Sequence, residues 1–151
     1  MTQRYGSAAI FGAILLLCFA AAWEIPAAAT DPVAIIVNPS NAITSVSIPD
    51  LNRIFLGEKS RWPNGKHVFL IMAPPGSPER ASILKNVYKM TESDYAKYFL
   101  QASFTGAISA PPKDAASAAE IKQLVAENPG AIGYVKQQDV DDTVKVILKI
   151  Q

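Results

Sequence analysis

The stretch APPGSPERASIL, residues 73–84, brings together residue types that could bind an anion. Gly76 and Ser77 stand just before a helical pattern, so free backbone amides and the positive end of a helix dipole would face a ligand placed there. Arg80 could add charge-assisted hydrogen bonds, which are often bidentate. This pattern indicates a candidate ligand site at Gly76, Ser77 and Arg80.

The same residues also describe an ordinary capped helix. Ser77 suits the N-cap, and Pro78 suits the first helical position, where a missing amide costs least. Glu79 would complement the helix dipole, but it puts a negative charge where an anionic ligand would sit. The sequence leaves both interpretations open.

No constellation of residues typical of an enzyme stands out. His67 is the single histidine, Cys18 is the single cysteine, and the sequence has no G-x-S-x-G nucleophile elbow. Asp139, Asp141 and Asp142 are close in sequence, but neighbouring residues on a loop point apart, so we expect a solvated turn. We therefore expect no catalytic residues, no metal and no cofactor.

The N-terminal segment has the order of features that is typical of a secretory signal peptide. Arg4 is followed by an apolar run over residues 8–22 and by small residues at Ala27 and Ala29. We expect cleavage after Ala29, which gives a signal peptide at 1–29, a domain at 30–151 and a periplasmic location. A retained membrane anchor is the alternative, because the apolar run approaches the length needed to span a bilayer.

The charge balance argues against a nucleic-acid partner. The chain has 14 Lys and Arg against 13 Asp and Glu, a net charge of +1. A protein that binds nucleic acid needs a basic face, which this composition does not favour.

The hydrophobic pattern alternates between strand and helix periods. It predicts strands at 32–38, 67–72, 131–135 and 144–150, helices at 47–55, 78–89, 91–104 and 117–127, and a loop at 105–114. Strands that alternate with helices indicate a layered α/β domain with a mainly parallel sheet flanked by helices.

Two motifs resemble the substrate-binding proteins of phosphate ABC transporters. LNRIFLGEKSRW, residues 51–62, resembles a segment of that family with an Ile-Phe, a Gly and a Trp. NPGAIGYV, residues 128–135, is similar to its Pro-Gly-(Ala/Ser)-Ile-Gly-Tyr-Val strand entry. The resemblance spans residues 33–135 and implies the type II periplasmic-binding-protein fold, of which this chain has the length of a single lobe.

In that family a loop after the strand matched by 67–72 holds phosphate with an Arg, an Asp and a Gly-Ser-Gly-Thr sequence. Gly76 and Ser77 match the Gly-Ser pair. The remaining family positions fall on Ala73, Pro75, Pro78 and Glu79. The resemblance therefore implies a site at Gly76 and Ser77, with Arg80 as a compensating charge.

Three residues of the first motif are candidate loop neighbours of that site: Lys59, Arg61 and Trp62. For Trp62 the alternative is a half-buried core aromatic, and for the two cations it is a solvated turn. Gly130, Gly133 and Tyr134 of the second motif are expected to be structural.

The resemblance implies an exported, non-enzymatic module that binds phosphate or another oxyanion. A single open lobe would bind in the millimolar range at best. Tighter capture would need a second lobe from a homodimer or another protein. The alternative is an accessory or protein-interaction module with the same fold and no ligand, working beside an ABC transporter or a sensor.

Overall fold

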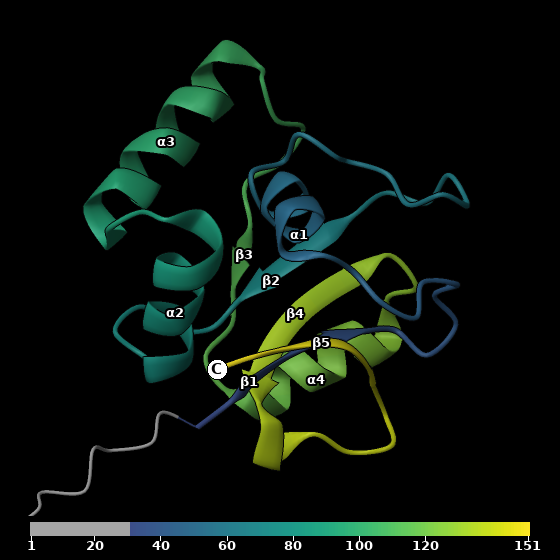
Figure 1. Cartoon of the computed structure of the whole chain (residues 1–151). Coiled ribbons are helices and arrows are strands. Elements are labelled where there is room, and N and C mark those ends of the chain that lie inside the picture. Colours follow the sequence, from purple (N-terminus) through teal and green to yellow (C-terminus); the bar gives the residue numbers. More distant parts are fainter. Residues whose placement is uncertain (1–30) are drawn as a thin grey trace, which may run out of the picture.

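A computed structural model describes residues 31–151, so the predicted signal peptide at 1–29 lies outside the described residues (Figure 1). The strands are β1 (Val33–Val37), β2 (Phe69–Met72), β3 (Lys113–Asp114), β4 (Ala131–Lys136) and β5 (Lys145–Ile150). The helices are α1 (Ile48–Phe55), α2 (Pro78–Ile83), the π-helix η1 (Leu84–Tyr88), α3 (Glu92–Thr105), α4 (Ala118–Glu127) and the short 3-10 helix η2 (Gln137–Asp139).

The strands form one sheet in the order β3-β2-β4-β1-β5. β2 pairs in parallel with β3 and with β4, whereas β1 pairs antiparallel with β4 and with β5. Four of the five described strands therefore run in one direction and β1 runs against them. The predicted α/β lobe with a sheet flanked by helices is confirmed. The expected mainly parallel pairing is corrected to a mixed sheet, because both pairings of the reversed β1 are antiparallel and only β2 pairs in parallel with its neighbours.

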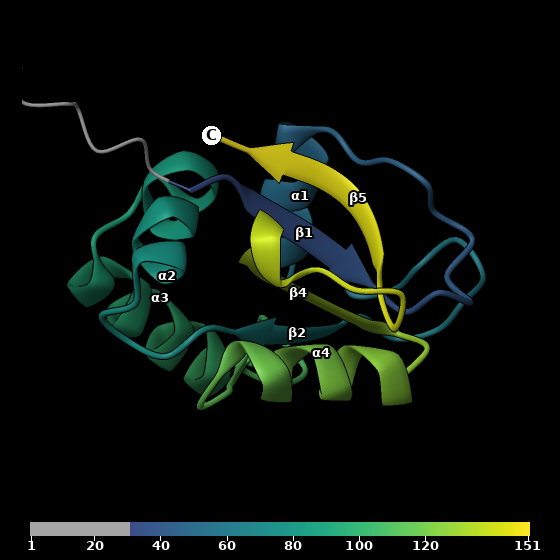
Figure 2. The ribbon, with the colours of Figure 1, turned by 90° about the horizontal axis from the view of Figure 1, so that it is seen from below.

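Helices cover both faces of the sheet, as two adjacent residues of β4 show. A Cβ placed on Gly133 would meet Ile121 of α4, so this residue faces α4. Tyr134 points to the other face, where its ring lies 6.3 Å from that of Phe55 in α1. Figure 2 shows the same arrangement, with α4 below β2 and β4 and α1 above these two strands.

Each of the four predicted helices begins at a capping side chain, including the Ser77 cap that the sequence predicts. The N-cap side chains of Ser47, Ser77, Thr91 and Ser117 accept hydrogen bonds from the amide three residues further on. The predicted helix at 78–89 is split, because α2 passes into the π-helix η1 before it ends at Lys89, whose φ is +58°.

The predicted loop at 105–114 is wrong at its end. Lys113 and Asp114 form β3 and pair with Ile71 and Met72 of β2. A strand of two exposed residues carries no periodic pattern, so its pairing depends on contacts that are distant in sequence. Among residues 31–151 no helix is long and apolar enough to cross a membrane.

Candidate functional site

The turn at 73–77 links β2 to α2 and has a fixed geometry. Ser77 N donates to Pro74 O at 3.1 Å, and Gly76 has a φ of +83°, which glycine adopts without strain. Ser77 Oγ accepts from Arg80 N at 3.3 Å, as an N-cap does. Within residues 31–151 no hydrogen bond engages the amides of Gly76 and Glu79, so both remain available as donors.

Ala73 anchors the start of this turn from two sides. Its amide donates to Tyr134 Oη at 3.1 Å, and its carbonyl accepts from Arg80 Nη1 at 3.0 Å. Tyr134 is fully buried, and burial raises the pKa of its hydroxyl. The turn is therefore held by one neutral and one charged partner beneath it.

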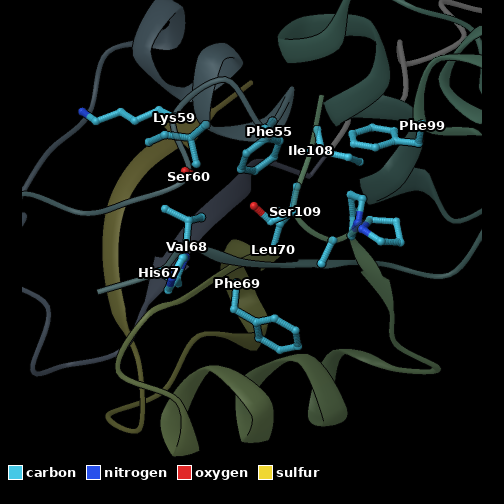
Figure 3. Close-up of a pocket in the computed structure, with 15 residues that line it drawn as sticks. Phe55, Lys59, Ser60, His67, Val68, Phe69, Leu70, Phe99, Ile108 and Ser109 are labelled. Carbon is cyan, nitrogen blue, oxygen red and sulfur yellow. The ribbon is translucent and has the colours of Figure 1, made fainter. Parts of the chain in front are cut away.

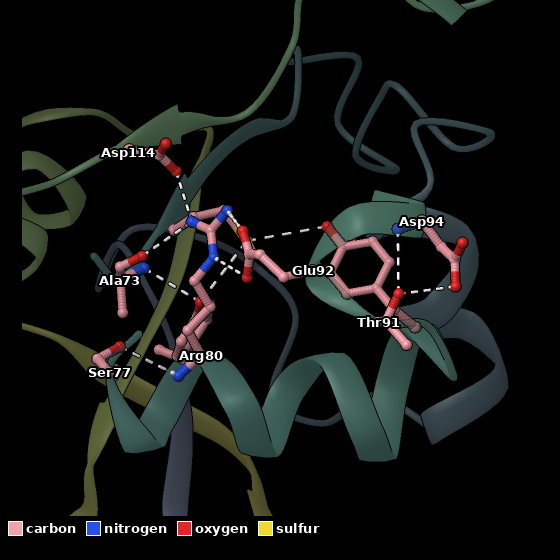
Figure 4. A network of polar contacts seen from close by, with 10 residues as sticks. Ala73, Ser77, Arg80, Thr91, Glu92, Asp94 and Asp114 are labelled. Carbon is pink, nitrogen blue, oxygen red and sulfur yellow. Dashed lines mark hydrogen bonds and ion pairs between the residues drawn. The ribbon is translucent and has the colours of Figure 1, made fainter. Parts of the chain in front are cut away.

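Arg80 is a buried residue at the centre of an ionic network (Figure 4). Its side chain is only 3% exposed. It donates from Nε to Glu92 Oε2 at 3.0 Å, from Nη2 to Glu92 Oε1 at 2.6 Å and from Nη1 to Asp114 Oδ1 at 2.7 Å. Together with the bond to Ala73 O, these contacts use four of the five N–H donors of the guanidinium.

The surroundings of Arg80 keep it charged. Burial alone would lower its pKa, but the hydrogen bonds to Glu92 and Asp114 outweigh burial and raise the pKa. The guanidinium carbon also lies 4.9 Å from the ring centroid of Tyr95, a cation–π contact. With two carboxylates on one guanidinium, the network carries a net negative charge.

A small cavity of about 170 Å³ lies between the N-terminal ends of α2 and α4. The N-cap serines Ser77 and Ser117 both line it, with Tyr134 and Ile121 among the other lining residues. Both helices follow the carboxyl ends of parallel strands, β2 and β3, and this edge is where open α/β sheets bind ligands.

One carboxylate also lines this cavity. The Glu79 side chain is 17% exposed, and its Oε1 lies 3.8 Å from Lys136 Nζ. The same Nζ lies 3.7 Å from Asp31 Oδ2, so this lysine is shared by two acids. Lys136 therefore offsets only part of the negative charge near the turn.

Gly76, Ser77 and Arg80 stand close together in the turn and the first turn of α2. The Arg80 guanidinium points away from Ser77, toward Ala73, Glu92 and Asp114 (Figure 4). Lys59, Arg61 and Trp62 do not join them. They precede the amino end of β2, whereas the turn follows its carboxyl end. Trp62 is a core residue, 2% exposed, whose Nε1 donates to Gly130 O at 2.9 Å.

The residues of the second motif are structural, as the sequence predicts. A Cβ on Gly130 would lie 2.0 Å from His67 O, and a Cβ on Gly133 would lie 2.8 Å from Ile121 Cγ2. Both positions need glycine because neighbouring atoms leave no room for a side chain, although neither has a positive φ.

The sequence did not point to the partners of Arg80. Asp114 stands in the segment predicted as a loop. For Glu92 the sequence indicated only an acidic residue in the first turn of α3. Neither position indicates an ion pair, because the three residues meet only when α3 and β3 have folded around α2. Among the described residues, no group of three or more His, Cys, Asp or Glu could hold a metal ion.

No family model and no curated protein matches the sequence. Several solved structures do. A putative phosphate ABC transporter substrate-binding protein with bound phosphate from Clostridium perfringens is similar over 78% of this chain and 44% of its own, with a TM-score of 0.63 and 21% identity. An ABC-type phosphate transport receptor from Vibrio cholerae is similar over 78% of this chain and 45% of its own, with a TM-score of 0.58 and 22% identity. PstS from Borrelia burgdorferi is similar over 78% of this chain and 46% of its own, with a TM-score of 0.60 and 18% identity.

These similarities show the fold. This chain spans less than half the length of each of these proteins. Its described residues form a single α/β lobe of the periplasmic-binding-protein type, as the resemblance implied.

Proposed function

We propose that this chain is an exported, non-enzymatic solute-binding module that holds a small oxyanion, such as phosphate, at the turn formed by Gly76 and Ser77. The proposal places the module in the periplasm after removal of residues 1–29. An ABC transporter or a sensor would receive the bound module.

The observation that carries this proposal is the pair of unengaged amides, of Gly76 and Glu79, at the start of α2. Ser77 and Glu79 line the cavity at the carboxyl edge of the sheet, and Gly76 directly precedes Ser77 in the turn. Amides and a hydroxyl at a helix start are the donors that an oxyanion uses. The fold supports the same inference, because one similar structure is described with bound phosphate.

In this proposal Gly76 and Ser77 contact the ligand. Arg80 acts indirectly, because it holds the turn in place and adds a positive charge on its buried side. The guanidinium holds Ala73 O and supplies a positive charge near the turn, but Glu92 and Asp114 engage most of its donors. Ser77 Oγ can donate its proton to a ligand while it still accepts from Arg80 N.

The expected affinity is weak. Two amide contacts and a hydroxyl contact contribute roughly 0.5–1.5 kcal/mol each, and the helix end adds roughly 0.3–1 kcal/mol. A millimolar dissociation constant needs about 4 kcal/mol. We therefore expect millimolar binding, with Glu79 as the main unfavourable charge.

The test is an NMR titration of residues 30–151 with sodium phosphate and sodium sulfate. Binding at the turn should move the amide signals of Gly76, Ser77 and Glu79 in a saturable way. Trp62 fluorescence is a poor reporter, because the indole is buried beyond the opposite end of β2. Chloride at the same ionic strength is the control for salt effects.

Two matched serine variants separate binding from helix capping. Ser77→Ala should lose the response to phosphate and about 1 kcal/mol of stability. Ser47→Ala removes a similar cap from α1 and should lose a similar stability while the response is kept. If Ser77→Ala responds as the unchanged protein does, the hydroxyl does not contact the ligand.

A second function is favoured by the acidic surroundings of the turn. Glu79, Glu92 and Asp114 lie around it, and Pro78 lacks an amide donor. These features suit a ligand-free accessory or protein-interaction module. An absence of amide shifts with phosphate and sulfate up to tens of millimolar would leave this second function in place of the first.

A further inference from the structure

A second cavity, of about 250 Å³, lies at the amino end of β2, away from the turn (Figure 3). We call it the hairpin pocket, after the adjoining hairpin that the bridge between Arg61 and His67 closes. Its walls are largely apolar and come from α1, β2, α3 and the segment before β3, with Phe55, Leu70, Phe99, Ile108, Pro111 and Pro112 among the lining residues. The polar lining residues include Ser60, His67 and Ser109, and the Ser109 hydroxyl points toward the pocket (Figure 3).

The pocket exists because β3 is short. β3 pairs with Ile71 and Met72 only, so the first half of β2 has no strand beside it on that edge. The segment 108–112 passes there as an irregular chain and forms a wall of the pocket. Phe69 lines the pocket and is 37% exposed, an unusual exposure for an aromatic residue of an inner strand.

Gly57 sets the opposite wall. It has a φ of +79°, and a Cβ there would lie 2.6 Å from Ile108 Cγ2. The absence of a side chain lets the loop after α1 approach Ile108 closely. Two segments that are far apart in sequence thereby meet across the pocket.

The chain beside the pocket is basic. Arg53, Lys59, Arg61 and Lys66 stand between residues 51 and 78, with Glu58 as the single acidic residue in that range. Arg61 and His67 form a bridge that closes a hairpin, and the Arg61 and Lys66 side chains are exposed on it. The rest of the described chain is slightly acidic. Arg53 is paired with Glu58, whereas Lys59 lines the pocket, and Arg61 and Lys66 belong to the hairpin that continues from the lining residues Ser60 and His67.

We propose that the hairpin pocket docks an acidic, extended segment of a partner protein, which inserts one apolar side chain and places its carboxylates against the hairpin cations. The volume supports a single side chain, because typical small-molecule pockets measure roughly 300–1,000 Å³ and a cavity of about 150 Å³ already holds benzene. Charge complementarity selects an acidic segment. This surface is separate from the turn and does not depend on oxyanion binding.

The test uses fluorescein-labelled peptides of about eight residues with a central Phe flanked by Glu and Asp, followed by fluorescence anisotropy with the 30–151 protein. Peptides with a central Ala, or with Lys in place of the acids, are compared. We expect the acidic Phe peptide to bind, the Ala peptide to bind about tenfold more weakly, and added salt to weaken binding. Equal binding of acidic and Lys-flanked peptides would overturn the proposal.

Two variants locate the binding. Ser109→Phe, at an exposed position whose hydroxyl points into the pocket, should fill it and abolish binding, whereas Ser45→Phe, also exposed, should not. Lys66→Glu should weaken binding about threefold or more and reduce its salt dependence. Lys97→Glu, exposed on α3, should leave the affinity near that of the unchanged protein.

Three outcomes would reject the proposal. Peptide binding that Ser109→Phe and Lys66→Glu both leave unchanged would place the peptide elsewhere. A rise in melting temperature with phenylacetate, without any peptide response, would make the pocket a small-molecule site. Sedimentation with phosphatidylglycerol vesicles, again without a peptide response, would make the basic hairpin a membrane-binding surface. A phosphate titration of the same samples reports on the turn alone, so the two proposals can fail independently.

Discussion

Arg80 connects three parts of the chain through one buried charge. It belongs to α2, its carboxylate partners belong to α3 and β3, and it also holds the carbonyl that begins the turn. Truncation of such a residue leaves buried or half-buried partners without a counter-charge. The arginine that the sequence indicates as a ligand contact therefore has a structural task that can be measured.

We expect Arg80→Met to lower the free energy of unfolding by about 2–4 kcal/mol, somewhat less than for a fully buried pair because Glu92 and Asp114 are 46% and 52% exposed. Urea unfolding followed by circular dichroism measures this loss. Arg53→Met is the control, since Arg53 and Glu58 form an exposed pair at 3.7 Å and should contribute less than about 1 kcal/mol. Similar losses in both variants would contradict a structural role for Arg80.

Glu79 provides the sharpest test of charge at the turn. Glu79→Gln keeps the size of the side chain and removes the negative charge that lines the cavity. We expect it to tighten phosphate binding about threefold to tenfold, as measured by the same amide titration. Glu127→Gln, at an exposed position in α4, is the matched control. If Glu79→Gln leaves the affinity unchanged, the anion does not bind near this carboxylate.

At the scale of elements, local signals predicted helices better than strand pairings. Capping residues at Ser47, Ser77, Thr91 and Ser117 act within one helical turn, so the sequence alone placed all four helix starts. The passage from α2 into η1 and the two residues of β3 have no comparable local signal. They depend on how α3 and the segment after it pack against α2 and β2.

Lys89 ends η1 in a left-handed conformation that glycine adopts more easily. We expect Lys89→Gly to raise the free energy of unfolding by about 0.5–1 kcal/mol, because relief of the strain exceeds the added entropy of the unfolded chain. Gly106, with a φ of +69° at the end of α3, provides the reverse experiment, and Gly106→Ala should be destabilising by a similar amount. Thermal unfolding measures both, and a destabilised Lys89→Gly would contradict this account.

Lys122 of α4 and Asp141, which follows η2, form a second contact between elements, at 2.5 Å. The hydrogen bond from Lys122, followed by those from the side chain and backbone of Thr143, lowers the pKa of Asp141 from 3.8 to about 2. A carboxyl group with a lowered pKa stabilises the fold above its ordinary pKa, and this contribution is lost as the pH falls from about 4 to about 2.

An NMR titration of the Asp141 carboxyl carbon measures this effect directly. In Lys122→Met the pKa of Asp141 should rise toward its ordinary value, since only the bonds from Thr143 remain. Stability should then depend less on pH over the acidic range. An unchanged pKa in Lys122→Met would mean that the ion pair does not form in solution.

At the scale of the whole molecule, the order of elements was predictable and their directions were only partly so. Alternating strands and helices indicated an α/β lobe, and four of the five described strands agree in direction. β1 runs the other way and pairs antiparallel with both β4 and β5. No residue of the VAIIV segment distinguishes the two directions, so the sequence did not predict this reversal. The sequence did not predict the partners of Arg80 either, because Glu92 and Asp114 reach it only through the tertiary arrangement of α3 and β3.

This arrangement makes α3 a separable unit of the fold. Tyr95 and Phe99 pack against Tyr88, and the remaining polar ties include Glu92 to Arg80 and Tyr98 to Leu56 O. On its outer face Leu100 and Phe104 are 61% and 85% exposed, so its last turns bury little apolar surface. Figure 1 shows α3 at the edge of the molecule, away from the sheet.

We therefore expect native-state hydrogen exchange to show α3 opening before the sheet. Amides in the second half of α3 should exchange fastest among the helices, and those of β1 and β4 should exchange only on global unfolding. Arg80→Met should speed exchange in α3 by more than its effect on global stability predicts, because it cuts the link to Glu92. Equal protection of α3 and β4 in the unchanged protein would mean that the lobe opens as one unit and that the Arg80 network stabilises it as a whole.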